Sequence, residues 1–206
     1  MSSTRTLILG AVRIYEPVHG YVVRRELVRW QAHEWANLNP GSVYNALRTL
    51  DRQGFIDEVA ATEDSRGPQR TSYRLTPGGL QEFLALVRDG LATPAPHRPD
   101  VLHAALCFIW ALPRDEVIPL LERRAQAIER LLREAASDIV AVLADPNRPD
   151  HVAELITVRE LRLGGELEWT RSLVARIHNG SYVFAGESGR PWYVPPVLAA
   201  STEFAR

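Results

Sequence analysis

Apolar residues at the start of the chain recur every three or four positions, which is the spacing of an amphipathic helix. This pattern predicts a helix from Thr4 to about Ile14, ended by Pro17, and a second helix from His19 or Gly20 to Trp30. Several apolar residues of each segment recur at this helical spacing. We therefore expect two short helices, each with an apolar face.

A third helix is predicted after Asn39, a favourable capping residue, with Pro40 at the first helical position. Gly54 is a typical stop signal at its end. Its apolar residues follow the i, i+4, i+7 pattern of one buried face: Val43, Leu47 and Leu50. The opposite side of this helix is polar.

Two β-like segments follow, 55–61 and 71–75, joined by the polar loop 62–70. A fourth helix is predicted to begin near Pro77. The order helix, helix, helix, hairpin, helix is that of a winged helix-turn-helix. The fold class predicted for the whole chain is therefore mainly α with a small β-hairpin.

Three prolines in residues 92–100 disfavour helix and indicate a hinge. We predict a winged helix-turn-helix domain over 1–91, a helical dimerisation domain over 100–180 and a tail over 181–206. The second domain is predicted to hold three helices, over 101–111, 113–143 and 149–177. Two adjacent glycines, Gly164 and Gly165, interrupt the last of these patterns.

The charge of the chain gives little support to nucleic-acid binding by itself. The 206 residues carry a net charge of −1, and the first 90 hold 11 arginines against 10 acidic residues. A DNA-binding protein needs a basic face and not a basic total. The positions of the arginines must therefore decide the question.

Several functional classes find no support in the sequence. The chain has one cysteine, and its histidines lack metal-ligand spacing, so neither a disulfide nor a metal site is expected. No nucleophile–base arrangement and no phosphate-cradling glycine loop is visible, so we expect no enzyme and no cofactor. No signal peptide or membrane span is recognised, and we expect a cytoplasmic protein with no membrane partner.

The polar side of the third predicted helix supplies candidate DNA contacts. In a winged helix-turn-helix this helix enters the major groove. Arginine can bind guanine there and asparagine can bind adenine, while hydroxyl groups often bind phosphate. The candidates on this helix are Ser42, Tyr44, Asn45, Arg48 and Arg52. The predicted wing adds Arg66, Arg70 and Arg74, which can follow the backbone or reach into the minor groove.

Four motifs in residues 4–90 resemble those of the PadR family of transcriptional regulators. The runs HGYVVRREL (19–27), PGSVYNALRTL (40–50), GFI (54–56) and RTSYRLTPGG (70–79) occur in the family's order and spacing. The resemblance implies a homodimer, formed by the C-terminal helices, that binds a pseudo-palindromic operator in double-stranded DNA, usually as a repressor. Asn45 departs from residues that are common in the family, which affects the expected base preference.

Two alternatives remain open at the level of the sequence. Phe108, Trp110 and Trp169 suggest a pocket for a small-molecule effector, although aromatic residues on helices also serve as plain core. The near-neutral N-terminal part is also compatible with a winged-helix module that binds proteins and has lost its affinity for DNA.

Overall fold

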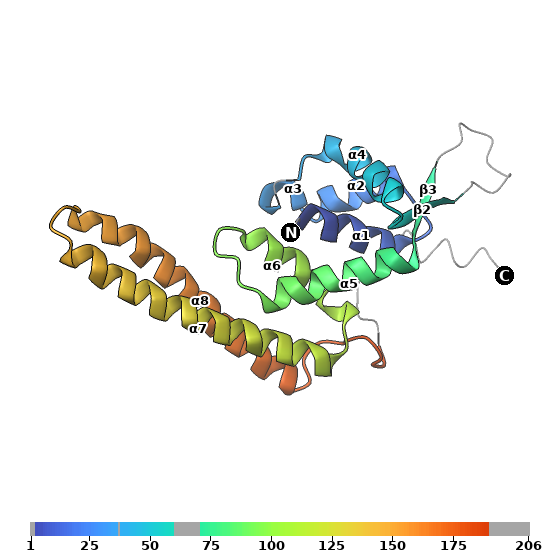
Figure 1. The fold of residues 1–206 in the computed structure, drawn as a ribbon. Coiled ribbons are helices and arrows are strands. Elements are labelled where there is room, and N and C mark those ends of the chain that lie inside the picture. Colours follow the sequence, from blue (N-terminus) through green and yellow to red (C-terminus); the bar gives the residue numbers. More distant parts are fainter. Residues whose placement is uncertain (1–2, 37, 60–70, 190–206) are drawn as a thin grey trace.

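The computed structural model describes residues 3–36, 38–59 and 71–189 (Figure 1). The N-terminal part begins with three helices and a helical turn that leads into a fourth helix. Their bounds are α1 Ser3–Tyr15, α2 Gly20–Arg29, α3 Ala32–Trp35, the 3₁₀ turn Pro40–Ser42 and α4 Val43–Arg52. The long helices α1, α2 and α4 agree closely with the sequence pattern.

Asn39 caps the turn that precedes α4, as its position predicted. Its side-chain oxygen accepts a hydrogen bond from the Gly41 backbone nitrogen at 2.8 Å. The third predicted helix differs in one respect, because its first three residues form a 3₁₀ turn and the α-helix begins at Val43. The four-residue helix α3 was not predicted, because it is too short to show a helical period.

The sheet has three antiparallel strands, β1 Val18–His19, β2 Ile56–Val59 and β3 Ser72–Leu75, in the order β1-β3-β2. The strands β2 and β3 confirm the predicted hairpin, in shorter form. The strand β1 was not predicted, because two residues show no alternation. It places His19 opposite Ser72 and so joins the start of α2 to the hairpin.

Helix α5, Pro77–Ala92, follows the hairpin and is capped by Thr76, whose hydroxyl accepts a hydrogen bond from the Gly79 nitrogen at 2.9 Å. A β-carbon on Gly79 would lie 1.7 Å from the Phe55 carbonyl oxygen, so only glycine fits at this crossing. The segment predicted as one helix over 101–111 is divided into α6, Pro99–Leu106, and a 3₁₀ turn, Ile109–Ala111.

The proline-rich segment connects two helices that pack together. Helix α6 lies against both α1 and α5, and Phe108, which follows it, is completely buried. The same core continues to Leu121 on the next helix and to Ile177 further along the chain. The apolar core therefore spans the hinge that was predicted at 92–100, and the division into domains stays a prediction.

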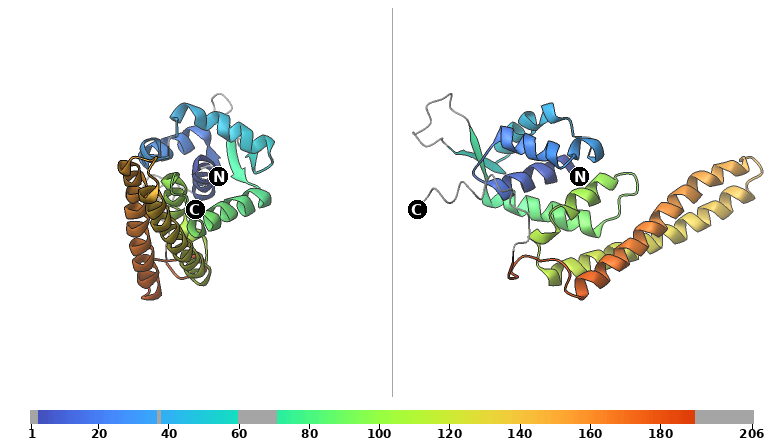
Figure 2. Two further views of the ribbon diagram at one scale, coloured as in Figure 1. Left: turned by 60° about the vertical axis from the view of Figure 1, so that its left-hand side comes forward. Right: turned by 180° about the vertical axis from the view of Figure 1, so that it is seen from behind.

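Two long helices, α7 Arg114–Ala144 and α8 Ala153–His178, form an antiparallel pair joined through the 3₁₀ turn Asp150–Val152. Figures 1 and 2 show this pair projecting from the N-terminal part as a helical arm. Helix α8 is continuous through Gly164 and Gly165. A small second apolar cluster lies inside the arm and contains Ile128, Leu163 and Leu167.

The segment 181–189, which we call the strap, folds back onto the base of the arm. Its Phe184 side chain is 1 % exposed, and the Ala185 nitrogen donates a hydrogen bond to the Leu112 carbonyl oxygen at 3.2 Å. The first part of the predicted tail is thus packed against the core. In the described ranges no helix is both long and apolar enough to cross a membrane, and no three His, Cys, Asp or Glu side chains gather as around a metal ion.

Candidate nucleic-acid interface

Helix α4 separates its apolar and polar residues completely. Val43 and Leu47 are fully buried and Leu50 is 4 % exposed, as the spacing predicted. All five residues proposed from the sequence as DNA contacts are exposed: Ser42, Tyr44, Asn45, Arg48 and Arg52. Helix α4 therefore offers a polar surface of the kind that a major groove can accept.

Two of these five side chains are already hydrogen-bonded within their own segment. The Ser42 hydroxyl donates to the Asn39 carbonyl oxygen at 2.7 Å. Arg52 lies back along α4 and donates to the Thr49 hydroxyl at 3.3 Å. Tyr44, Asn45 and Arg48 are not held in this way by side-chain hydrogen bonds in the described part of the chain, and they are the most available members of the set.

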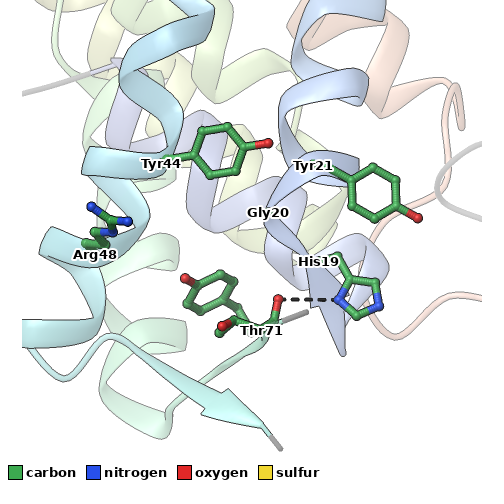
Figure 3. A pocket seen from close by; sticks show the side chains of 7 residues that line it. His19, Gly20, Tyr21, Tyr44, Arg48 and Thr71 are labelled. Carbon is green, nitrogen blue, oxygen red and sulfur yellow. Dashed lines mark hydrogen bonds between the residues drawn. The ribbon is translucent and has the colours of Figure 1, made fainter. Parts of the chain in front are cut away.

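A hollow of about 580 Å³ lies beside α4, between the start of α2 and the strand β3 (Figure 3). Tyr44 and Arg48 line it from α4, and Tyr21 lines it from the first turn of α2. Thr71 and Tyr73 line it from the hairpin. Three separate elements thus converge on one concave surface.

His19 fixes the position of α2 against the hairpin. Its Nδ1 lies 2.9 Å from the Ser72 hydroxyl and 3.3 Å from the Thr71 carbonyl oxygen. The imidazole stacks on the Tyr21 ring with centroids 5.7 Å apart. Because the imidazole contacts the hairpin and also stacks on Tyr21, His19 positions Tyr21 at the edge of the hollow.

The sequence did not single out Tyr21 as a contact residue. Its side chain is 46 % exposed, almost the same fraction as that of Tyr44. The available signal was an aromatic residue placed directly after Gly20, at the start of a helix. Only the fold shows that Tyr21 and Tyr44 line the same hollow.

Arg48 contributes a positive charge that no described carboxylate neutralises by an ion pair. Its effect is visible at Tyr73. Burial raises the pKa of the Tyr73 hydroxyl, the nearby Glu58 and Asp51 raise it further, and Arg48 lowers it. The guanidinium of Arg48 therefore supplies positive potential at the hollow, against two carboxylates that weaken it.

The predicted wing is described only in part. Arg74 is exposed on β3 and lies opposite Asp57 in the register of the sheet. Arg66 and Arg70 lie outside the described residues. Their proposed contacts with DNA remain predictions.

The three aromatic residues suggested as an effector pocket occupy different surroundings. Phe108 is fully buried and meets the Phe83 and Trp110 rings edge-on, with centroids 5.2 Å and 6.4 Å away. Trp110 lines a hollow of about 340 Å³ together with Phe83 and Phe184. Phe108 and Trp169 are not among its described lining residues, although Trp169 packs on the same apolar core from α8.

Comparison with known proteins gives a match for the N-terminal part of the chain. Residues 8–85 match the model of the transcriptional regulator PadR-like family, which is a family of regulators and not of enzymes. No curated protein matches the chain.

Among similar solved structures is PadR of Bacillus subtilis in complex with operator DNA, with 23 % identity over 84 % of this chain and 98 % of that chain and a TM-score of 0.38. The same protein in complex with p-coumaric acid gives 24 % identity over 85 % and 99 %, with a TM-score of 0.35. The PadR-like regulator BC1756 of Bacillus cereus gives 16 % identity over 84 % and 94 %, with a TM-score of 0.36. Over residues 8–85, this chain therefore matches the PadR-like family of transcriptional regulators.

Proposed function

We propose that this protein is a sequence-specific DNA-binding repressor that acts as a homodimer on a pseudo-palindromic operator. The observation that carries the proposal is the exposed polar surface of α4, where Asn45 is exposed and where Tyr44 and Arg48 line the hollow beside the helix. The family match over residues 8–85 supports the same class of function.

In this proposal α4 lies in the major groove. Arg48 and Asn45 reach base edges, where a guanidinium reads guanine and an amide reads adenine. Tyr44 lines the hollow from α4 and Tyr21 lines it from α2, and their hydroxyls bind phosphates of the DNA backbone that lies against this surface. Ser42 and Arg52 add contacts at the two ends of the helix. The wing arginines Arg66, Arg70 and Arg74 follow the neighbouring backbone.

A second copy of the chain supplies the other half of the reading surface. Three large apolar residues spaced three positions apart on α8 are exposed: Leu155 by 75 %, Val158 by 47 % and Leu161 by 71 %. They share one side of the helix, and Val140 and Leu143 of α7 are also exposed. We call the part of the chain from α1 to α5, which carries α4, the reading head. Burying the exposed apolar surface in a symmetric contact would remove it from water and join the reading heads of two copies.

A small molecule is proposed to release the protein from DNA. B. subtilis PadR has been solved with p-coumaric acid, which supports a small-molecule effector for this chain as well. The sequence suggested Phe108, Trp110 and Trp169 for this role. We place the effector in the hollow beside Trp110, because that residue combines an aromatic wall with access to solvent.

Titration of the protein with DNA from its own promoter region tests the proposed function. Fluorescence anisotropy should show specific binding that weakens steeply as salt rises, because phosphate contacts release counterions. Arg48→Ala should weaken specific binding by roughly 5- to 150-fold if it reads a base, since a bidentate base contact discriminates by about 1–3 kcal/mol. Tyr44→Phe and Tyr21→Phe should weaken binding to all sequences alike.

The matched control is Arg123→Ala, which removes an exposed arginine from α7 and leaves the reading head unchanged. It should bind DNA like the unaltered protein. A folded variant with Tyr44, Arg48, Arg66 and Arg70 all changed to alanine should lose specific binding. Full affinity in that variant would reject the proposal and favour the alternative, a winged-helix module that binds proteins.

A further inference from the structure

Arg124, on α7, is the largest fully buried side chain of the described residues, with 1 % of its surface exposed. Burying a guanidinium costs free energy unless its donors are satisfied. The residues that satisfy them come from two other helices. Arg124 therefore connects α7 to α5 and α8, and the sequence does not show this connection.

One nitrogen of the Arg124 guanidinium closes the end of α5. Nη1 donates hydrogen bonds to the carbonyl oxygens of Gly90 at 3.1 Å and Thr93 at 2.9 Å. The last carbonyls of a helix have no partner within the helix, and a positive charge is favourable at that end. Arg124 thus binds the C-terminal end of α5, where the unpaired carbonyl oxygens attract a positive charge.

The rest of the guanidinium is held by α8. Nε and Nη2 of Arg124 both contact the Glu166 Oε1 atom, at 2.8 Å and 2.6 Å. Three helices, α5, α7 and α8, meet in this one planar group. Because a guanidinium has fixed donor directions, the arrangement defines an orientation as well as a distance.

A second polar contact joins α5 to α7 nearer the start of α7. Arg88 pairs with Glu116, and one of their hydrogen bonds measures 3.3 Å. Glu116 and Arg124 are eight residues apart on α7, which corresponds to about 12 Å along the helix. Two attachments separated in this way resist rotation of the arm relative to α5.

Helix α5 in turn packs on α1, so it belongs to the body that carries α4. The arm leaves this body along α7 and α8, as Figures 1 and 2 show. If two copies join through their arms, the angle between α5 and α7 determines how far apart the two α4 helices lie. In a dimer that reads DNA, this distance corresponds to the spacing of the operator half-sites.

We propose that Arg124 is a positioning residue that determines which spacing of half-sites the dimer accepts. The proposal rests on the proposed function, since it requires a DNA-binding homodimer. Arg124 does not touch DNA. It acts by holding α5, which moves with the reading head, against the arm, with Glu166 fixing the plane of its guanidinium.

The test uses the full-length protein and a set of duplexes. Each duplex carries the two half-sites found by footprinting the promoter region, with the spacer lengthened or shortened by single base pairs. The unaltered protein should prefer one spacing by about tenfold or more, because each base pair also rotates one half-site about the helix axis. A duplex with one half-site reports on the reading head alone.

Arg124→Met keeps a long side chain but removes every hydrogen bond to α5 and α8. We expect its affinity for the single half-site to match that of the unaltered protein and its preference among spacings to fall to about threefold or less. Arg124→Lys keeps the charge without the planar fork and should give an intermediate profile. Arg123→Met, at the exposed neighbouring position, is the matched control and should keep the full preference.

Arg124→Met with an unchanged spacing profile would overturn the proposal. If that variant does not fold, Glu166→Gln replaces it, since the change removes the charge that orients Arg124 and leaves the contacts with α5. A broadened profile in Glu166→Gln supports the proposal, and an unchanged one contradicts it. Failure of the proposed function is distinguishable, because the unaltered protein would then bind no promoter DNA specifically or would bind it as a monomer.

Discussion

The Phe108 ring fills the space beside Gly10 in which any other residue would place its β-carbon. An ideal β-carbon on Gly10 would lie 2.2 Å from Cζ of Phe108. Gly10 is in the middle of α1, and Phe108 follows α6. The contact therefore presses the first helix of the reading head against the segment that leads into the arm, and it permits only glycine on α1.

We predict that Gly10→Ala destabilises the protein. In an unhindered helix this change would add up to about 1 kcal/mol of stability. Here the new methyl group collides with a ring that is itself fully buried, and such overpacking typically costs about 1–3 kcal/mol. Urea unfolding should show a lower midpoint, and adding Phe108→Leu should recover part of the loss. A midpoint at or above that of the unaltered protein would contradict the contact.

Gly164→Ala is predicted to have the opposite effect. Gly164 also lies inside a helix, α8, but no atom lies within 4 Å of the position that its β-carbon would take. The gain in helix propensity should therefore appear in full, as roughly 0.5–1 kcal/mol of added stability. The same urea titration measures it. A loss of stability would indicate that a second copy of the chain covers this position.

These two glycines illustrate the limit of inference from sequence. Both occur within helical patterns of similar quality. They differ because the Phe108 ring lies against Gly10, and only the fold brings these two residues, 98 positions apart, together. The apolar stripe of α4 was predictable because its period lies within the helix itself. The same holds for the Asn39 cap, which depends on neighbouring residues.

The candidate site was predictable only where its residues lie on a single helix. Tyr44 and Arg48 follow from the polar side of one helix. Tyr21 does not, because its place beside Tyr44 depends on how α2 is held by His19 against β3. Arg124 is a second example inside the molecule, since its partners lie at the end of α5 and on α8, and only the tertiary fold brings these two segments to it.

The Tyr15 hydroxyl gives the protein a sensitivity to high pH. It donates a hydrogen bond to Glu26 at 3.2 Å, and burial, followed by the negative charge of Glu26, raises its pKa to about 12. The folded state thus keeps this proton when the unfolded chain loses it, near pH 10. The contribution to stability is complete below about pH 10 and is lost as the pH rises toward 12.

The comparison that isolates this effect is between the unaltered protein and Tyr15→Phe. The free energy of unfolding of the unaltered protein should fall more between about pH 8 and about pH 11 than that of the variant, since only the former has the proton to lose at this position. Chemical denaturation at both pH values measures the difference. An identical loss in the two proteins would show that Tyr15 does not carry the sensitivity.

Leu161→Glu is predicted to weaken the homodimer. Leu161 is 71 % exposed on α8, so the change should leave the fold of a single chain intact while placing a charge in the proposed contact between copies. Sedimentation equilibrium should show a dissociation constant raised by at least about tenfold, which is 1.4 kcal/mol. Gln126→Glu adds the same charge at an exposed position of α7 and should leave the dimer unchanged. Equal dissociation constants for both variants would exclude this side of α8 from the interface.

The strap is held by Arg114, at the first turn of α7. Its guanidinium donates hydrogen bonds to the carbonyl oxygens of Ser181 at 3.1 Å and Tyr182 at 2.9 Å, and to the Glu187 carboxylate at 2.6 Å. It also lies over the Phe184 ring, 4.7 Å from the centroid. One side chain thus fixes both the backbone and the aromatic anchor of this segment.

We therefore predict that Arg114→Ala releases the strap without unfolding the rest of the chain. Chymotrypsin should cleave after Phe184 several times faster in the variant, because this side chain must leave the core before the bond fits a protease. Arg148→Ala removes an arginine that pairs with Asp145 near the tip of the arm, away from the strap, and it should not change the rate. Cleavage after Phe184 at the same rate in all three proteins would mean that the apolar contact alone holds the strap.

Release of the strap should also affect the hollow beside Trp110, because Phe184 forms one of its walls. A released strap should open that hollow to solvent and change the Trp110 fluorescence.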